Sequence, residues 1–284
     1  MRRPICLSLL CCSLLSLSTL ASLPTRADDT PGPTPLPAWQ TLEFEQQAYF
    51  VTARSQLAIA PDSADPARWQ LTANSSVASN SEDVVLELAP ADGRALRRSR
   101  LSKGKEQRYK TYDFLPDYIL RVRHDPPADT ALPPARWPVS SRKKITYPAL
   151  EPGVVVTDAY ALVLLAERFG RSTEASAEVA VNTEFNFYRV RMSHTDGPPL
   201  KVDYQLAGAG AISASRQTRG VALQVSPLGE QREKPDFSLL GLNGDITVLF
   251  DADSGLPLQL RGTAPRIGST EINLKAAKLR NPAE

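Results

Sequence analysis

The feature that most constrains the fold of this chain is a strict alternation of apolar and polar residues in its C-terminal half. Residues 200–206 place an apolar side chain at every second position, with charged or amide side chains between them. The same alternation recurs over residues 221–225, 246–250 and 256–260. A period of two buries one face of a strand and leaves the other face free, which is typical of antiparallel sheets. The sequence therefore predicts a mainly β fold.

Turn segments and one helical segment complete the predicted fold. Residues 91–93 and 251–255 have the composition of hairpin loops, and these signals together indicate roughly twelve strands. Apolar residues after Asp158 recur at helical spacing, with Thr157 or Asp158 as the candidate N-cap and Gly170 as the stop. We expect a strongly curved antiparallel sheet, a half-barrel or open barrel, with one main α-helix packed on it.

The first 27 residues have the layout of a bacterial secretory signal peptide. Arg2 and Arg3 precede an apolar run over residues 5–23, and the small residues Thr25 and Ala27 provide a cleavage site. We expect export to the periplasm and no retained membrane span. The alternative is an uncleaved anchor, because the apolar run approaches the length of a bilayer span. All three cysteines lie in this leader, so the mature chain has no disulfide or thiolate metal site.

The charge balance of the mature chain gives no support for nucleic-acid binding. The leader contains three arginines and no acid, so its removal lowers the basic residues from 33 to 30, against 31 acidic ones. Residues 28–41 contain four prolines within seven residues, which favours an extended tether. The expected organisation is a signal peptide (1–27), a proline-rich tether (28–41) and a single β-rich domain (42–280).

The most distinctive local feature is basic. The segment from Arg94 to Arg123 contains ten basic residues and three acidic ones. Adjacent hairpins would bring the basic side chains together, and such a surface suits phosphates or carboxylates. The predicted anionic-ligand residues are Arg98, Arg100, Arg108, Lys110, Arg121 and Arg123. The alternative is a solvated face paired with acids from elsewhere in the chain.

A resemblance adds to this reading. The chain ends with Phe250-Asp251, a short loop, Gly255-Leu256-Pro257, then Ile267-Gly268 and a last strand at 271–279. This order, with the helix from Asp158, resembles an uncharacterised family of secreted proteobacterial proteins, firmest over residues 150–280. That family is similar in architecture to the periplasmic lipoprotein carriers, in which a curved half-barrel is closed by helices over an apolar interior. The resemblance implies a fold and a compartment, and it brings no catalytic residue.

A curved sheet under a helix can enclose an apolar cavity large enough for an acyl chain. The alternative is a filled core. The residues expected to line the cavity are Phe185, Phe187, Val202, Tyr204, Leu223, Val248, Phe250 and Leu258.

The sequence offers little for catalysis. His124 and His194 are the only histidines, and neither has the spacing of a zinc motif, so we predict no metal site and no cofactor. Glu43 and Glu45 share a strand face and could form a glycosidase-like pair.

The leading hypothesis is a non-enzymatic periplasmic or envelope binding or carrier domain for an amphipathic anionic ligand, such as a lipid or glycolipid. One alternative is a structural or assembly partner of another envelope protein, with a solid core. A second alternative is a glycan hydrolase that uses Glu43 or His194.

Overall fold

The computed structural model describes residues 34–48, 51–128 and 132–280. The predicted leader, its cleavage site and the start of the predicted tether lie outside these residues. Within the described part of the chain, no helix is long and apolar enough to cross a membrane.

Eight strands come from the first half of the described chain. They are β1 (Trp39–Ala48), β2 (Val51–Pro61), β3 (Trp69–Val77), β4 (Asn80–Leu88), β5 (Ala95–Lys103), β6 (Arg108–Phe114), β7 (Tyr118–His124) and β8 (Val139–Thr146). A short 3-10 helix, η1 (Pro134–Arg136), precedes β8. The second half contributes β9 (Val156–Thr157), α1 (Ala161–Gly170), β10 (Ser176–Asn182), β11 (Phe187–Leu206), β12 (Gly210–Pro227), β13 (Asn243–Asp251), β14 (Pro257–Ala264) and β15 (Gly268–Leu279).

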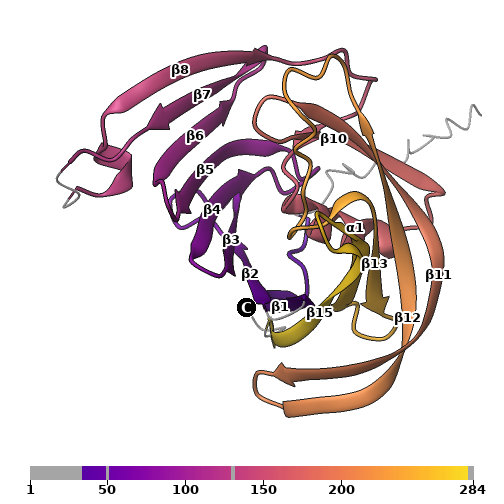
Figure 1. The fold of residues 1–284 in the computed structure, drawn as a ribbon. Helices are drawn as coiled ribbons and strands as arrows, with labels where there is room; N and C mark the ends of the chain where they lie inside the picture. The colour runs from indigo at the N-terminus through magenta and orange to yellow at the C-terminus, as the bar shows by residue number, and fades with distance from the viewer. Residues whose placement is uncertain (1–33, 49–50, 129–131, 281–284) are drawn as a thin grey trace, which may run out of the picture. The chain divides into compact units, whose positions relative to one another are not determined.

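All fifteen of these strands form one curved sheet in the order β8-β7-β6-β5-β4-β3-β2-β1-β15-β14-β13-β12-β11-β10-β9 (Figure 1). Neighbouring strands pair antiparallel, except for the parallel pair β9–β10 and a short parallel contact between β11 and β15. Strands β8 and β9 are the two edges of the sheet, so the barrel is open. The predicted fold class is confirmed, with more strands than the roughly twelve that the sequence indicated.

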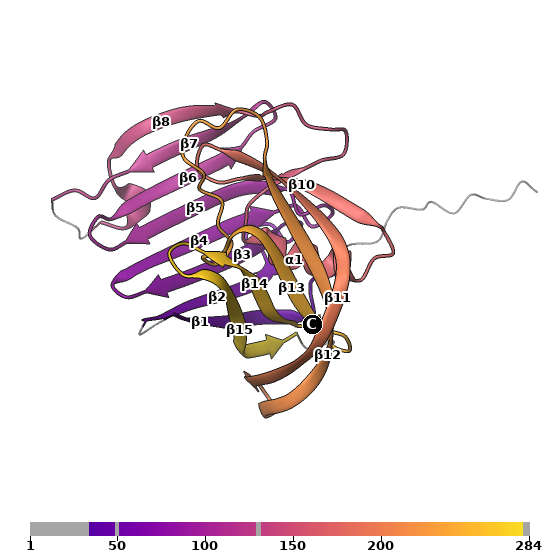
Figure 2. The same ribbon diagram turned by 45° about the vertical axis from the view of Figure 1, so that its right-hand side comes forward.

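The connections between strands fall at two ends of the barrel because successive strands run in opposite directions. We call one end the mouth; it carries the turns β1–β2, β3–β4, β5–β6 and β14–β15 and lies on the left of Figure 2. We call the other the plugged end; it carries the turns β4–β5 and β13–β14.

Helix α1 blocks the plugged end. The Arg168 guanidinium donates to the carbonyl of Pro90 at 3.1 Å in the β4–β5 turn, and Trp39 Nε1 on β1 donates to Glu167 Oε2 at 2.6 Å. Eight of the ten helical residues are buried, including Glu167, as expected for a mostly apolar helix surrounded by protein.

The helix begins three residues after Asp158, the start that the sequence suggested. Asp158 forms a turn instead: its Oδ1 accepts the Tyr160 amide at 2.9 Å, and its carbonyl accepts the Ala161 amide at 3.1 Å. This turn leaves the other carboxylate oxygen of Asp158 free to pair with β5.

The first strand begins earlier than the predicted domain start at Leu42. Trp39 is fully buried and pairs with Leu279 of β15. The proline-rich segment therefore leads directly into the seam between the two halves of the sheet, and its last three residues belong to β1.

Candidate functional site

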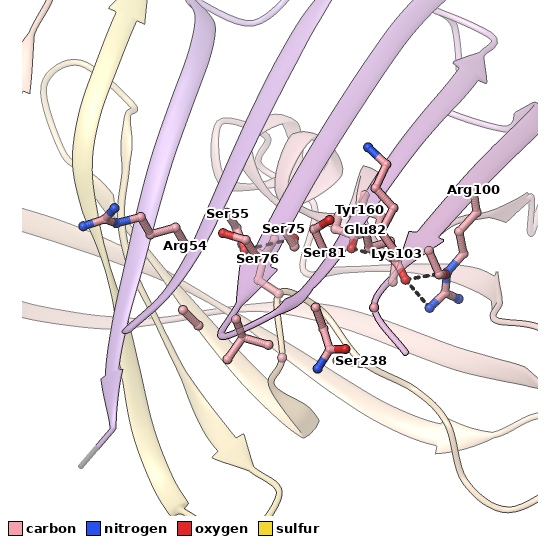
Figure 3. A pocket seen from close by; sticks show the side chains of 18 of the residues that line it. Arg54, Ser55, Ser75, Ser76, Ser81, Glu82, Arg100, Lys103, Tyr160 and Ser238 are labelled. Carbon is pink, nitrogen blue, oxygen red and sulfur yellow. Dashed lines mark hydrogen bonds and ion pairs between the residues drawn. The ribbon is translucent and has the colours of Figure 1, made fainter. Parts of the chain in front are cut away.

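A cleft of about 860 Å³ opens at the mouth of the barrel (Figure 3). Its walls come from the mouth ends of β2–β5, the β5–β6 and β14–β15 turns, residues 158–160 before α1, and the loop between β12 and β13. Because α1 and the core fill the plugged end, this cleft faces away from the most tightly packed part of the molecule. Its volume is within the range of sites that hold small organic ligands.

The inner face of the sheet changes from apolar to polar along each strand that forms the cleft. On β2, Ile59 and Leu57 are buried near α1, and Ser55 follows at the mouth. On β4, Val84 is buried, and Glu82 follows at the mouth. The period of two keeps these side chains on one face, so the cleft is the polar continuation of the core.

Polar side chains cross the floor of the cleft in a row (Figure 3). The hydroxyls of Ser55 and Ser75 lie 3.0 Å apart on adjacent strands. The Tyr160 hydroxyl donates to Glu82 Oε1 at 3.3 Å, and Arg100 Nε donates to Glu82 Oε2 at 2.6 Å. Burial raises the pKa of Tyr160, and the charge of Glu82 adds to this effect. The phenol therefore stays a neutral hydrogen-bond donor at every physiological pH.

Cations and apolar groups enter the cleft from different parts of the sheet. Arg100 and Lys103 lie on β5, and Lys105 lies in the turn that follows. Apolar lining comes from the β14–β15 turn, at Pro265 and Ile267. Five strands separate β5 from β14 in the sheet order, so these two groups lie on different walls of the cleft, with Arg54 on β2 and Val77 on β3 between them. Arg100 and Lys103 form ion pairs with Glu82 and Asp83.

Backbone strain is concentrated around this cleft. Three non-glycine residues of the described chain have positive φ: Ala78 at 51°, Leu240 at 53° and Arg266 at 65°. Leu240 lines the cleft, and Arg266 lies between the lining residues Pro265 and Ile267. Ala78 follows Val77, which also lines it. All three lie in tight turns, namely β3–β4, β14–β15 and the turn closed by the Leu239–Leu242 bridge, where a positive φ is part of the turn geometry.

The structure divides the six predicted anionic-ligand residues into two groups. Arg98 and Arg100 line the cleft, whereas the remaining four do not. Arg98 is 3% exposed and forms an ion pair with Asp158 at 2.5 Å. It also donates to the backbone carbonyl of Asn182 at 3.0 Å, so its terminal guanidinium nitrogens are engaged within the chain.

Lys110 and Arg121 converge on one carboxylate. Their side chains reach Glu184 at 2.6 and 2.5 Å, and both residues are buried. Burial alone would raise the pKa of Glu184, but the hydrogen bond and charge of Lys110, with the charge of Arg121, outweigh burial and lower it. The last two predicted cations pair locally: Arg108 with Glu106, and Arg123 with Asp125 at 2.8 Å.

These pairs match the alternative that the sequence left open, a basic face neutralised by acids from the same chain. The role of the six residues in binding an anion stays a prediction. Among them, Arg100 lies at the cleft with its side chain 35% exposed, and its guanidinium pairs with Glu82.

The eight residues predicted to line an apolar cavity do not line the cleft at the mouth. They pack in two cores instead. The main core, with α1, holds Tyr204, Leu223, Val248, Phe250 and Leu258, and Val202 packs against it. Phe187 belongs to a second core under β6–β8, and Phe185 packs against that core.

The residues considered for catalysis, Glu43, Glu45 and His194, have defined contacts in the structure. Glu43 Oε1 accepts from Gln56 at 3.0 Å, and Glu45 pairs with Arg54 at 3.2 Å. The His194 ring stacks on Phe169, with ring centroids 4.5 Å apart. No group of three or more metal-ligating side chains occurs among residues 34–48, 51–128 and 132–280.

Sequence reasoning missed the row of Ser55, Ser75, Glu82 and Tyr160. The signal was present in the alternation: the inner positions of β2–β4 continue past their apolar residues as serine, asparagine or glutamate. A face that changes from apolar to polar within one strand marks a point where the core meets an open cleft.

No protein-family model matches the chain, and no curated protein sequence matches it. The fold is similar to the crystal structure of a β-barrel-like protein of the domain of unknown function DUF1849 from Brucella abortus. The TM-score is 0.45 at 6% sequence identity, over 85% of this chain and 96% of that chain.

Proposed function

We propose that this chain is a non-enzymatic binding protein of the bacterial envelope that holds an amphipathic anionic ligand, such as a lipid or glycolipid, in the cleft at its mouth. The observation that carries the proposal is that one cleft is lined both by the exposed cations Lys103 and Lys105 beside β5 and by Pro265 and Ile267 of the β14–β15 turn, on a different wall. A ligand with an anionic group at one end and hydrocarbon at the other matches both sides. The leader-like N-terminus supports the periplasm as the compartment.

Each part of the ligand has partners in this arrangement. Arg100, Lys103 and Lys105 would contact the anionic group, and guanidinium and ammonium groups suit phosphate or carboxylate oxygens. Hydroxyls of Ser55 and Ser75 would accept or donate to polar groups of the head. Hydrocarbon would lie against the turn that carries Ile267, which removes apolar surface from water.

The test is a titration of the full chain, purified without detergent, with two soluble probes: short-chain phosphatidic acid and short-chain phosphatidylcholine. We expect saturable binding of the first and weaker binding of the second. The S75W variant fills the cleft and should weaken binding by roughly tenfold or more, whereas S213W, at an exposed position of β12, should bind as the wild type does.

A second pair of variants separates the loss of charge from a folding defect. K103Q/K105Q removes cations at the cleft, and K201Q/K278Q removes two exposed lysines elsewhere. Selective weakening of the anionic probe by the first pair alone supports the proposal. Absence of saturable binding of either probe, or unchanged binding by a folded S75W variant, would overturn it.

A second candidate is a structural or assembly partner of another envelope protein. The observation that favours it is that six of the eight predicted cavity residues are buried in the two hydrophobic cores, and Val202 and Phe185 pack against those cores. Crosslinking in cells of the native host that retrieves one dominant envelope protein, together with failure of both probes to bind, would favour this candidate.

A further inference from the structure

Exposed apolar side chains gather at the mouth of the barrel. Six large hydrophobic residues of the described chain are exposed, and only Leu279 lies at the plugged end. Three of the others are Val51 at 45% exposure, Val77 at 44% and Ile267 at 37%; Val77 and Ile267 line the cleft, and Val51 opens β2 at the mouth. Single exposed apolar residues are common, but a contiguous group marks an interaction surface.

These three residues are neighbours along the rim. Val51 opens β2, and Val77 closes β3 opposite Ala53, which is on the same face of β2 as Val51. Ile267 lies in the β14–β15 turn and lines the same cleft as Val77. In the sheet order, β3, β2, β1, β15 and β14 are consecutive, so the three positions lie on adjacent turns.

Unpaired cations flank this apolar rim. Lys105 and Arg266 are exposed, and no ion pair joins either of them to another residue of the described chain. Three nearby acids pair with other cations: Glu45 with Arg54, Asp83 with Lys103, and Glu106 with Arg108. Asp236 of the same cleft accepts hydrogen bonds from Thr183 and Tyr188. The rim therefore combines exposed apolar side chains with two cations that are in no ion pair of the described chain.

We propose that the rim defined by Val51, Val77, Ile267, Lys105 and Arg266 docks onto the surface of an anionic lipid bilayer. The two cations would meet headgroup phosphates, and the apolar side chains would enter the interface between headgroups and acyl chains. Docking in this orientation turns the cleft toward the membrane, so an amphipathic ligand could pass between bilayer and cleft without crossing water. This last consequence rests on the proposed function, whereas docking itself does not.

The test is co-sedimentation of the full chain with vesicles that contain phosphatidylglycerol, compared with vesicles of phosphatidylcholine alone. We expect binding to the anionic vesicles that weakens as salt is raised. The V51S/V77S/I267S variant should bind them roughly tenfold less or weaker, and K105Q/R266Q should lose a similar factor.

The chain contains its own matched control. Ile267 and Leu279 are both 37% exposed, but they lie beside opposite ends of β15. Loss of vesicle binding in I267S and not in L279S supports docking through the mouth. Equal loss in both variants, or no sedimentation of the folded wild type with anionic vesicles, would overturn it.

Failure of docking and failure of the proposed function give different results. A chain that binds the short-chain anionic probe but not the vesicles retains the cleft function and rules out docking. A chain that binds the vesicles but neither probe retains docking and rules out the cleft function.

Discussion

Arg98 on β5 forms a buried ion pair with Asp158, the residue that starts the turn into α1. The Nη1–Oδ2 distance is 2.5 Å, and the side chains are 4% and 6% exposed. The pair of Lys110 and Arg121 with Glu184 makes a second connection of the same kind. Because edge strands β8 and β9 share no ladder, these ion pairs join the first half of the sheet to the second across the open side of the barrel.

The first prediction concerns the strength of this connection. Replacing Arg98 by methionine keeps the approximate volume but leaves the Asp158 carboxylate buried and unpaired. We expect R98M to lower the free energy of unfolding by about 3–5 kcal/mol. The matched control is R97M, since Arg97 lies next to Arg98 but pairs with Asp113 at an exposed site, and it should cost less than about 1 kcal/mol. If urea denaturation gave equal losses of unfolding free energy in R98M and R97M, the buried pair would contribute no more stability than the exposed one.

The second prediction is a pH dependence at Glu184. Its folded-state pKa lies below the ordinary value of 4.5, so its ion pairs add stability that is present above pH 4.5 and is lost as the pH falls through the folded value. At neutral pH, E184Q should be less stable than the wild type by about 1–3 kcal/mol. This difference should shrink below pH 4.5, as measured by urea denaturation across that range.

The third prediction uses two turns with left-handed residues. Ala78 has a φ of 51° and is exposed, so A78G should relieve strain and raise stability by about 0.5–1 kcal/mol. Gly93 has a φ of 73°, and an added Cβ would lie 2.6 Å from Leu165 Cδ2 on α1. Thermal unfolding should therefore show G93A destabilised by about 2–4 kcal/mol. Effects of the same sign in both variants would contradict this account.

The fourth prediction concerns the anchoring of α1 to β1. Trp39 is fully buried, and its indole donates to Glu167, whose pKa is raised by burial despite that hydrogen bond. W39F should lower the free energy of unfolding by about 1–3 kcal/mol, because a buried carboxylate loses a donor. W137F removes a hydrogen bond to a neutral carbonyl in the loop before β8 and should cost less. The order of the two losses in denaturant unfolding checks the prediction.

Much of the fold could be predicted because alternation and turn composition are local signals. The hairpin turns at 91–93 and 251–255 and the helix ending at Gly170 all occur where the sequence placed them. Strand β8 was missed because it begins inside a proline-rich segment, at Val139 directly after Pro138. An edge strand tolerates a proline at its start, since one side of its ladder is empty.

The site could be predicted less well because it depends on contacts between distant parts of the chain. The basic run was visible, but its partners were not: Glu184 is 74 residues beyond Lys110, and Asp158 is 60 residues beyond Arg98. Whether a cation is free or already paired is decided by such contacts. The same holds for the cleft, whose lining residues come from strands, turns and loops in both halves of the sheet.

The pairing of β1 with β15 has a consequence for the order in which the sheet can form during synthesis. The other antiparallel neighbours in the sheet follow one another directly along the chain. Strands β1–β8 and strands β10–β15 can therefore each assemble from local hairpins. Strand β1 is the first to be synthesised, yet its second partner is the last. A chain that stops before Gly268 would therefore leave β1 with a bare edge, open to pairing with another copy and to aggregation.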